Sequence, residues 1–162
     1  MKRLIEAAII ATTLSACAVP VSGPAPDVYV VEQGEQDGGK ISSFAKKVQK
    51  FRDNGTRVEI RVKSCTSACT YFLLAWDVCT NPDTIYEFHA PQSYVMSLLG
   101  LPGPAHGQAT IVMAEDYNSR WPGLGTWFIS GSASRRTGPF ATKVTGSELN
   151  RVFGVPLCEG VA

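Results

Sequence analysis

The sequence predicts an α/β fold in which short parallel strands alternate with helices inside a single domain. Three observations lead to this prediction. Short β-branched segments alternate with longer stretches whose apolar residues recur at helical spacing. Turn signals such as Asn54-Gly55 and Asn81-Pro82-Asp83 separate them. The apolar content of 44% is enough for a packed core in one domain of ordinary size.

Residues 1–16 have the pattern of a secretory signal peptide. Lys2 and Arg3 form a basic start, a short apolar run follows from Ala7 to Ile10, and small residues precede Cys17. A helix needs about 20 apolar residues to cross a bilayer, so this run is too short to be a membrane span. We therefore expect residues 1–16 to be removed.

The segment Leu14-Ser15-Ala16-Cys17 resembles the lipobox of bacterial lipoproteins. The resemblance implies that Cys17 becomes the first mature residue, carries lipid including palmitate, and anchors the protein in a membrane. Ala18 after the cysteine resembles lipoproteins sent to the outer membrane of Gram-negative bacteria, which places the protein on its periplasmic face. The alternative is a plain secretory signal cut near Ala16 or Ala18.

Residues 17–28 read as a tether, and residues 29–162 as the folded domain. Prolines between small residues keep the tether extended. Cleavage removes Lys2, Arg3 and Glu6, which leaves 13 basic and 13 acidic side chains and a formal charge of zero. This balance lacks the positive charge that nucleic-acid binding requires, so no nucleic-acid partner is expected.

The first half of the domain predicts two β-α units. A strand from Val28 to Val31 precedes a helix from Ile41 to Phe51, and a strand from Arg57 to Val62 follows. A second helix begins near Ser67, and a strand from Thr84 to Phe88 ends at His89. Because ligands of parallel sheets collect at the carboxyl ends of strands, residues after these strands are candidates for a site.

The second half is predicted to be mainly helical. After a loop that follows His89, helices are expected from Ala109 to Arg120, from Leu124 to Ile129 and within Thr145 to Phe153. Pro122 stops the first of these, and Thr145-x-x-Glu148 has the spacing of a capping box.

Four cysteines remain in the mature domain: Cys65, Cys69, Cys79 and Cys158. An even number in an exported protein predicts two disulfides, with three pairings open. A zinc site is the alternative, but the spacing of Cys65 and Cys69 lacks the two-residue gap of a zinc knuckle. We expect no metal and no cofactor.

A nucleophilic serine needs a base within hydrogen-bond reach and backbone donors for an oxyanion. Ser67 follows a turn, and His89 ends a buried strand, whereas His106 lies in a loop rich in proline and glycine. His89 is therefore the better candidate base. Ser67 as a helix N-cap and His89 as a histidine bonded to backbone are the structural alternatives.

Three motifs carry a family resemblance: Asp37-Gly38-Gly39, then Cys65-Thr66-Ser67-Ala68-Cys69, then Phe88-His89-Ala90-Pro91. Their order and spacing resemble the Clp protease proteolytic subunit and crotonase superfamily, and most of all uncharacterised periplasmic Clp-protease-like proteins of bacteria. The resemblance covers roughly residues 28–158. It implies a fold of repeated β-β-α units wound into a superhelix, and it makes a homo-oligomer an expectation.

The resemblance also implies a role for each matched residue. Ser67 is the nucleophile, His89 the general base, and the N–H groups of Gly39 and Ala68 form the oxyanion hole, with Gly38 permitting the tight turn. The substrate would be a peptide or a protein.

The family's orienting aspartate is missing from this sequence. It would fall near Thr137, yet residues 131–143 contain no carboxylate. Glu115, Asp116 and Glu148 are candidate substitutes. Two functions therefore stay open: a serine peptidase or hydrolase, and a catalytically silent, lipid-anchored binding or scaffolding protein of the same fold.

Overall fold

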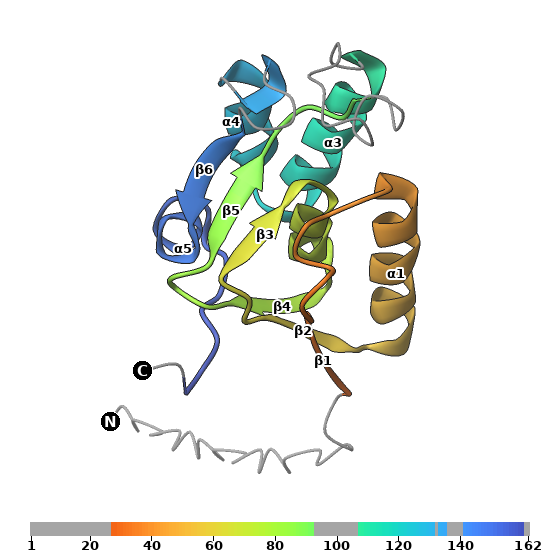
Figure 1. The fold of residues 1–162 in the computed structure, drawn as a ribbon, viewed down its shortest axis with the longest axis vertical. Helices are drawn as coiled ribbons and strands as arrows, with labels where there is room; N and C mark the ends of the chain where they lie inside the picture. The colour runs from red at the N-terminus through yellow and green to blue at the C-terminus, as the bar shows by residue number, and fades with distance from the viewer. Residues whose placement is uncertain (1–26, 93–106, 132, 136–140, 161–162) are drawn as a thin grey trace, which may run out of the picture.

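The fold is a mixed α/β domain, as predicted, but its strands form two small sheets (Figure 1). The computed structural model describes residues 27–92, 107–131, 133–135 and 141–160. The predicted signal peptide, Cys17, most of the tether, His106 and Thr137 lie outside the described residues. A mixed α/β domain with two small sheets does not by itself define a Clp-type superhelix, so that part of the expected fold stays a prediction.

The first sheet has the order β1-β2-β4, with all strands parallel. Its strands are β1 (Val28–Val30), β2 (Arg57–Ile60) and β4 (Asp77–Thr80). Helix α1 (Ile41–Asn54) joins β1 to β2 and ends at Gly55, whose φ of 66° permits the left-handed turn. The predicted β-α-β unit is confirmed, with boundaries that differ by up to three residues.

The second sheet has the order β3-β5-β6. Strands β3 (Ser64–Thr66) and β5 (Ile85–Phe88) are parallel, and β6 (Thr142–Thr145) is antiparallel to β5. The sequence pattern predicted β5 but missed β3, β4 and β6. Each of these has only three or four residues and directly adjoins a predicted helix or turn, whose stronger signal hides the strand.

The helices after β3 pack on and between these sheets (Figure 1). They are η1 (Ser67–Leu74), α3 (Gly107–Arg120), α4 (Leu124–Ser130), η2 (Ala133–Arg135) and α5 (Gly146–Phe153). The predicted capping box of α5 is confirmed, because Glu148 N donates to Thr145 Oγ1 and Thr145 N donates to Glu148 Oε2. No helix in the described part of the chain is long and apolar enough to span a membrane.

Segment η1 is the centre of the core. Seven of its eight residues are buried, and only Ser67 at its start is not. Phe72 packs against aromatic rings of β1 and α1, whereas Tyr71 packs against Tyr117 of α3. Because apolar packing surrounds η1, the residue at its first position is held between two well-packed layers.

Candidate active site

The site lies where two neighbouring parallel strands end at the same edge of the second sheet. Thr66, the last residue of β3, pairs with Glu87 of β5. Adjacent strands are about 4.8 Å apart, so Ser67 and His89 leave neighbouring strand ends. Both side chains are half-buried. The chain fold therefore brings the predicted nucleophile and the predicted base to one edge.

Ser67 has an unusual backbone conformation. Its φ is +57°, and it is the one non-glycine residue with positive φ among the residues that the structure describes. The cap of η1 is Thr66, which is extended and makes no side-chain capping bond. The alternative role of Ser67 as a helix N-cap is therefore wrong. Instead, Ser67 forms a sharp, left-handed corner between a strand and a helix.

The Gly38 backbone packs directly on this corner. A methyl group placed on Gly38 would lie 2.6 Å from the Thr66 carbonyl oxygen, 2.8 Å from Ser67 Cβ and 3.0 Å from Ala68 N. Gly38 also has a φ of +79°, which disfavours any side chain. Only glycine allows the turn before α1 to approach the Ser67 corner this closely.

Two backbone N–H groups border the Ser67 corner. Gly39 N has no acceptor among the described residues, whereas Gly38 N donates to Glu35 O. Ala68 is the second residue of η1, and the first N–H groups of a helix have no intrahelical acceptor. These two donors are the pair that the sequence motif singled out.

A polar cluster that the sequence did not reveal anchors the loop before Gly38. Tyr29 Oη and Lys47 Nζ both donate to the Glu35 carboxylate, and the Lys47 ammonium lies 4.2 Å from the centre of the Tyr29 ring. Burial alone would raise the pKa of Glu35, but the hydrogen bonds from Lys47 and Tyr29 outweigh it and lower that pKa. The three residues of this cluster lie in β1, in the loop before Gly38 and in α1, so no local motif marks the cluster.

His89 is oriented by the backbone. Its Nδ1 lies 2.8 Å from the carbonyl oxygen of Ala90, which is fully buried. A carbonyl can only accept, so Nδ1 carries the proton, and in the neutral ring Nε2 is left as an acceptor. The predicted alternative of a histidine bonded to backbone is thus present, and it leaves Nε2 free for a second partner.

No carboxylate orients His89 among the described residues. Asp116 accepts a hydrogen bond from Tyr71 Oη at 3.2 Å, and Glu148 is engaged in the cap of α5. Glu115 is exposed on α3. The described hydrogen bonds also include none between Ser67 Oγ and His89.

The cysteines form two disulfides, Cys65–Cys69 and Cys79–Cys158. The prediction of two disulfides is confirmed, and the open pairing is now assigned. The first brackets Ser67, and the second joins β4 to the C-terminal segment. In the described part of the chain, no group of potential ligands could hold a metal ion. The disulfides indicate an oxidising compartment outside the cytoplasm.

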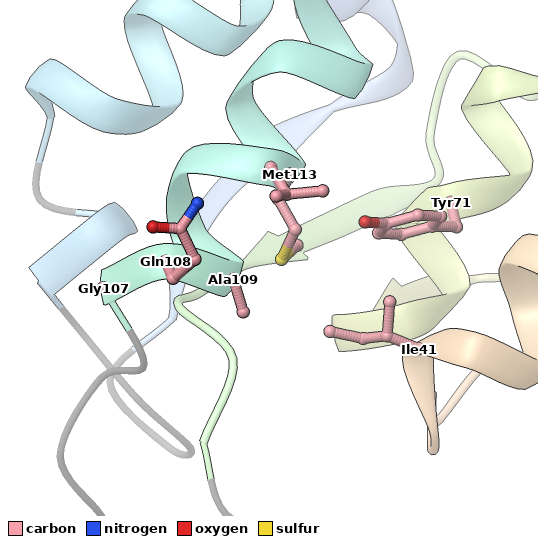
Figure 2. Close-up of a pocket in the computed structure, with 7 residues that line it drawn as sticks. Ile41, Tyr71, Gly107, Gln108, Ala109 and Met113 are labelled. Carbon is pink, nitrogen blue, oxygen red and sulfur yellow. The ribbon is translucent and has the colours of Figure 1, made fainter.

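An apolar pocket opens between α1, η1 and α3. It has a volume of about 470 Å³ and lies between the starts of α1 and α3 and the first turns of η1 (Figure 2). Figure 2 shows Ile41, Tyr71 and Met113 converging on this space. Ile41 follows Gly39 by two residues in the sequence and Tyr71 follows Ser67 by four, but neither Ser67 nor His89 lines the pocket. The sequence analysis missed it, because its walls come from three separate helices.

Comparison of the chain with protein-family models, curated proteins and solved structures finds no match.

Proposed function

We propose that this protein is a serine hydrolase of the cell envelope that cleaves an acyl bond through Ser67. The left-handed conformation of Ser67 is the observation that carries the proposal. A serine held in a strained turn between a strand and a helix presents its hydroxyl outward, as nucleophilic serines of other folds do. Strain of this kind is retained where the surrounding structure determines it and function uses it.

In the proposed mechanism, Ser67 Oγ attacks the substrate carbonyl while His89 Nε2 accepts the hydroxyl proton. The Nδ1–H bond to Ala90 O fixes the tautomer that this step requires. It takes the place of the missing aspartate in orienting the ring, although a neutral carbonyl stabilises the imidazolium less than a carboxylate would. The N–H groups of Gly39 and Ala68 would bind the oxyanion.

His89 then passes its proton to the leaving group, which departs and leaves the acyl-enzyme. When water attacks the acyl-enzyme, Nε2 accepts a proton from that water. Collapse of the second tetrahedral intermediate breaks the bond to Ser67 Oγ, which regains its proton from His89, and releases the acid. We propose a peptide or protein substrate, with an apolar side chain held in the apolar pocket between α1, η1 and α3.

The proposed location is the periplasmic face of an outer membrane. The two disulfides support an oxidising compartment, and the sequence Leu14-Ser15-Ala16-Cys17 supports lipid attachment at Cys17. A lipid tether on a domain with no net charge would hold the enzyme close to the membrane without electrostatic attraction to it. A homo-oligomer remains an expectation from the family resemblance.

One observation favours a second function. Ser67 Oγ and His89 make no hydrogen bond with each other, and among the described residues no carboxylate supports His89. A lipid-anchored binding or scaffolding protein of the same fold would have this arrangement if it had lost its activity. The apolar pocket would then bind a ligand without chemistry.

A labelling experiment separates the two functions. The mature chain, residues 17–162 with Cys17→Ser to keep it soluble, is exported to form its disulfides and treated with a fluorophosphonate. Intact mass and peptide mapping should show one adduct on Ser67. His89→Ala should slow labelling at least about 100-fold, as expected for the loss of a general base.

Ser64→Ala is the matched control, because Ser64 lies in β3 three residues before Ser67 and has no place in the mechanism. It should label at the wild-type rate. Folded wild-type protein without an adduct, or an adduct that persists in Ser67→Ala, would exclude the hydrolase and leave the binding protein.

A further inference from the structure

We infer that the Cys65–Cys69 disulfide is a positioning device that keeps Ser67 in its left-handed, reactive conformation, an inference that rests on the proposed hydrolase. The two cysteines lie two residues before and two residues after Ser67. Ser67 therefore occupies the middle of the covalent ring that the disulfide closes. Activity would then depend on the oxidised state of this one bond.

The ring restricts the backbone on both sides of Ser67. The Cα atoms of Cys65 and Cys69 are 5.2 Å apart. The same five residues would span about 13 Å if extended and about 6 Å in an α-helix. The cross-link therefore excludes an extended turn, and it holds the ends of the corner closer together than a regular helix does.

The two cysteines that close this ring are held in the protein interior. Both cysteines are fully buried, with Cys65 in β3 paired to Tyr86 and Cys69 within η1. The flanking backbone is fixed as well, because Thr66 N donates to Gln36 O at 2.7 Å and Thr70 Oγ1 donates to Ser67 O at 2.6 Å. Of these restraints, the disulfide is the only covalent one.

Without the cross-link, the intrinsic preference of an L-residue would act on Ser67. The left-handed conformation is disfavoured for residues with a Cβ, so an unrestrained corner populates it roughly tenfold less than the alternatives. In those alternatives Oγ no longer points as the mechanism requires. We therefore expect about a tenfold loss of Ser67 reactivity in a protein that is otherwise folded.

The chain supplies its own matched control. Cys79–Cys158 is also a buried disulfide, but it joins β4 to the C-terminal segment and does not bracket a candidate catalytic residue. Removing it should change global stability without changing the Ser67 corner. Comparing the two removals separates positioning from stability.

The test measures two properties of Cys65→Ala/Cys69→Ala and of Cys79→Ala/Cys158→Ala, both in the mature chain. The first is the rate of fluorophosphonate labelling of Ser67. The second is amide hydrogen exchange in peptides covering residues 64–70, which reports on the corner whether or not the protein is active. We expect about tenfold slower labelling and faster local exchange in the first variant only.

A folded first variant that labels and exchanges like the wild type would overturn the inference. If the wild type itself does not label, the proposed hydrolase fails, and the exchange data alone decide whether the disulfide holds the corner. If the first variant does not fold, the second variant retains only Cys65–Cys69, and its labelling should fall on reduction and return on reoxidation. Labelling that reduction leaves unchanged would equally overturn the inference.

Discussion

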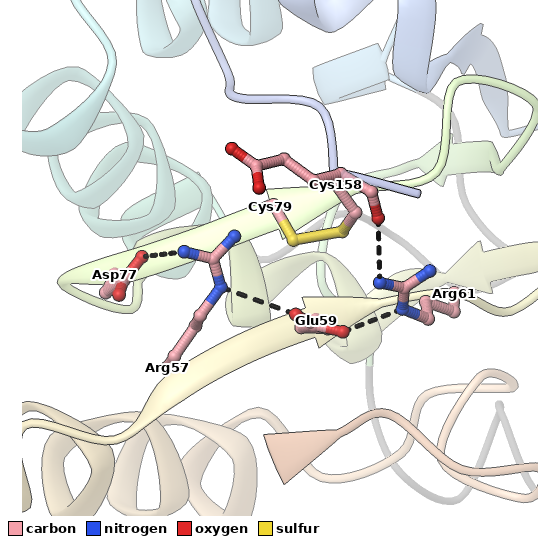
Figure 3. Close-up of polar contacts among 7 residues, drawn as sticks. Arg57, Glu59, Arg61, Asp77, Cys79 and Cys158 are labelled. Carbon is pink, nitrogen blue, oxygen red and sulfur yellow. Dashed lines mark hydrogen bonds and ion pairs between the residues drawn. A yellow bond between two sulfur atoms is a disulfide. The ribbon is translucent and has the colours of Figure 1, made fainter. Parts of the chain in front are cut away.

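Two regions of the molecule use the same covalent bond in opposite ways. The Ser67 corner, residues 65–69, is closed by a disulfide across a sequence separation of 4. The C-terminal closure, residues 156–159, is fixed to β4 by a disulfide across a separation of 79 (Figure 3). The first bond shapes one turn, whereas the second ties the C-terminal segment to β4, an edge strand of the first sheet.

The C-terminal closure is also supported by ordinary interactions. Thr80 N donates to Pro156 O, and Cys158 N donates to Thr80 O, each at 2.9 Å. Figure 3 shows Arg61, the residue after β2, reaching the backbone of this segment, with a hydrogen bond to Glu159 O of 3.3 Å. The region would keep much of its geometry without its disulfide, whereas the left-handed corner opposes its own backbone preference.

The largest expected difference is in global stability. In the chain-entropy model, a cross-link over 79 residues stabilises a fold by about 4 to 5 kcal/mol, and one over 4 residues by about 2 kcal/mol. Cys79→Ala/Cys158→Ala should therefore lower the free energy of unfolding about twice as much as Cys65→Ala/Cys69→Ala. Urea unfolding followed by circular dichroism measures both. Equal losses would mean that local strain, not loop closure, sets the contribution of the shorter bond.

Two glycines with nearly the same φ test how closely the backbone packs at the Ser67 corner. Gly38, at +79°, meets Thr66, Ser67 and Ala68, whereas Gly154, at +76°, has open space around it. Gly38→Ala should cost about 3 kcal/mol, because a clash adds to the backbone penalty, and it should abolish labelling of Ser67. Gly154→Ala should cost only about 1 kcal/mol.

Thermal unfolding and fluorophosphonate labelling of the two glycine variants check this prediction. Gly154→Ala serves as the control for the backbone penalty alone and should label normally. If Gly38→Ala were no less stable than Gly154→Ala, the close approach of Gly38 to the corner would be wrong.

Ser67 itself tests whether the corner is strained. Ser67→Ala keeps a Cβ at a φ of +57°, whereas Ser67→Gly removes it. Ser67→Gly should therefore be more stable than Ser67→Ala by about 1 kcal/mol, although neither variant can be labelled. Chemical denaturation of the pair measures this difference, in which the lost hydroxyl cancels. A glycine variant that is the less stable of the two would show that the corner is relaxed.

The two regions also differ in how far the sequence predicted them. Helical periodicity gave α1, apolar residues before the stop at Pro122 gave α3, and the Thr145-x-x-Glu148 pattern gave the cap of α5, because these signals are local. The positions of Ser67 and His89 at strand ends were predicted through the order of elements. The pairing of Cys65 with Cys69 was left open, because it depends on a backbone φ that no residue type dictates.

The features that sequence reasoning missed include a pairing between distant segments and a contact with the backbone. Strand β4 lies between the predicted helix and the turn at Asn81-Pro82-Asp83 and was not assigned, and its parallel pairing with Leu157 joins it to the C-terminal segment. The Ala90 carbonyl that binds His89 is invisible to any motif, because every residue has a carbonyl group. The missing aspartate was sought among carboxylates, while the observed partner of Nδ1 is the backbone.

The smallest expected effect concerns the helix that leads into the C-terminal closure. Helix α5 begins with the Thr145 and Glu148 capping box, and hydrogen bonds from Thr145 lower the pKa of Glu148 below its usual value. A carboxyl group with a lowered pKa stabilises the folded state above its unfolded pKa, and that contribution is lost as the pH falls through its folded pKa. Stability should therefore decline on acidification more in the wild type than in Glu148→Gln.

Thr145→Ala removes the reciprocal partner and should cost about 1 kcal/mol at neutral pH. Unfolding curves at neutral and acidic pH for the wild type and both variants measure the two contributions. Labelling of Ser67 should stay unchanged at neutral pH in both variants, since the cap lies in the other region. A cap variant that lowered labelling without unfolding would show that α5 and the Ser67 corner are coupled through β6, which precedes α5 and pairs with β5, the strand before His89.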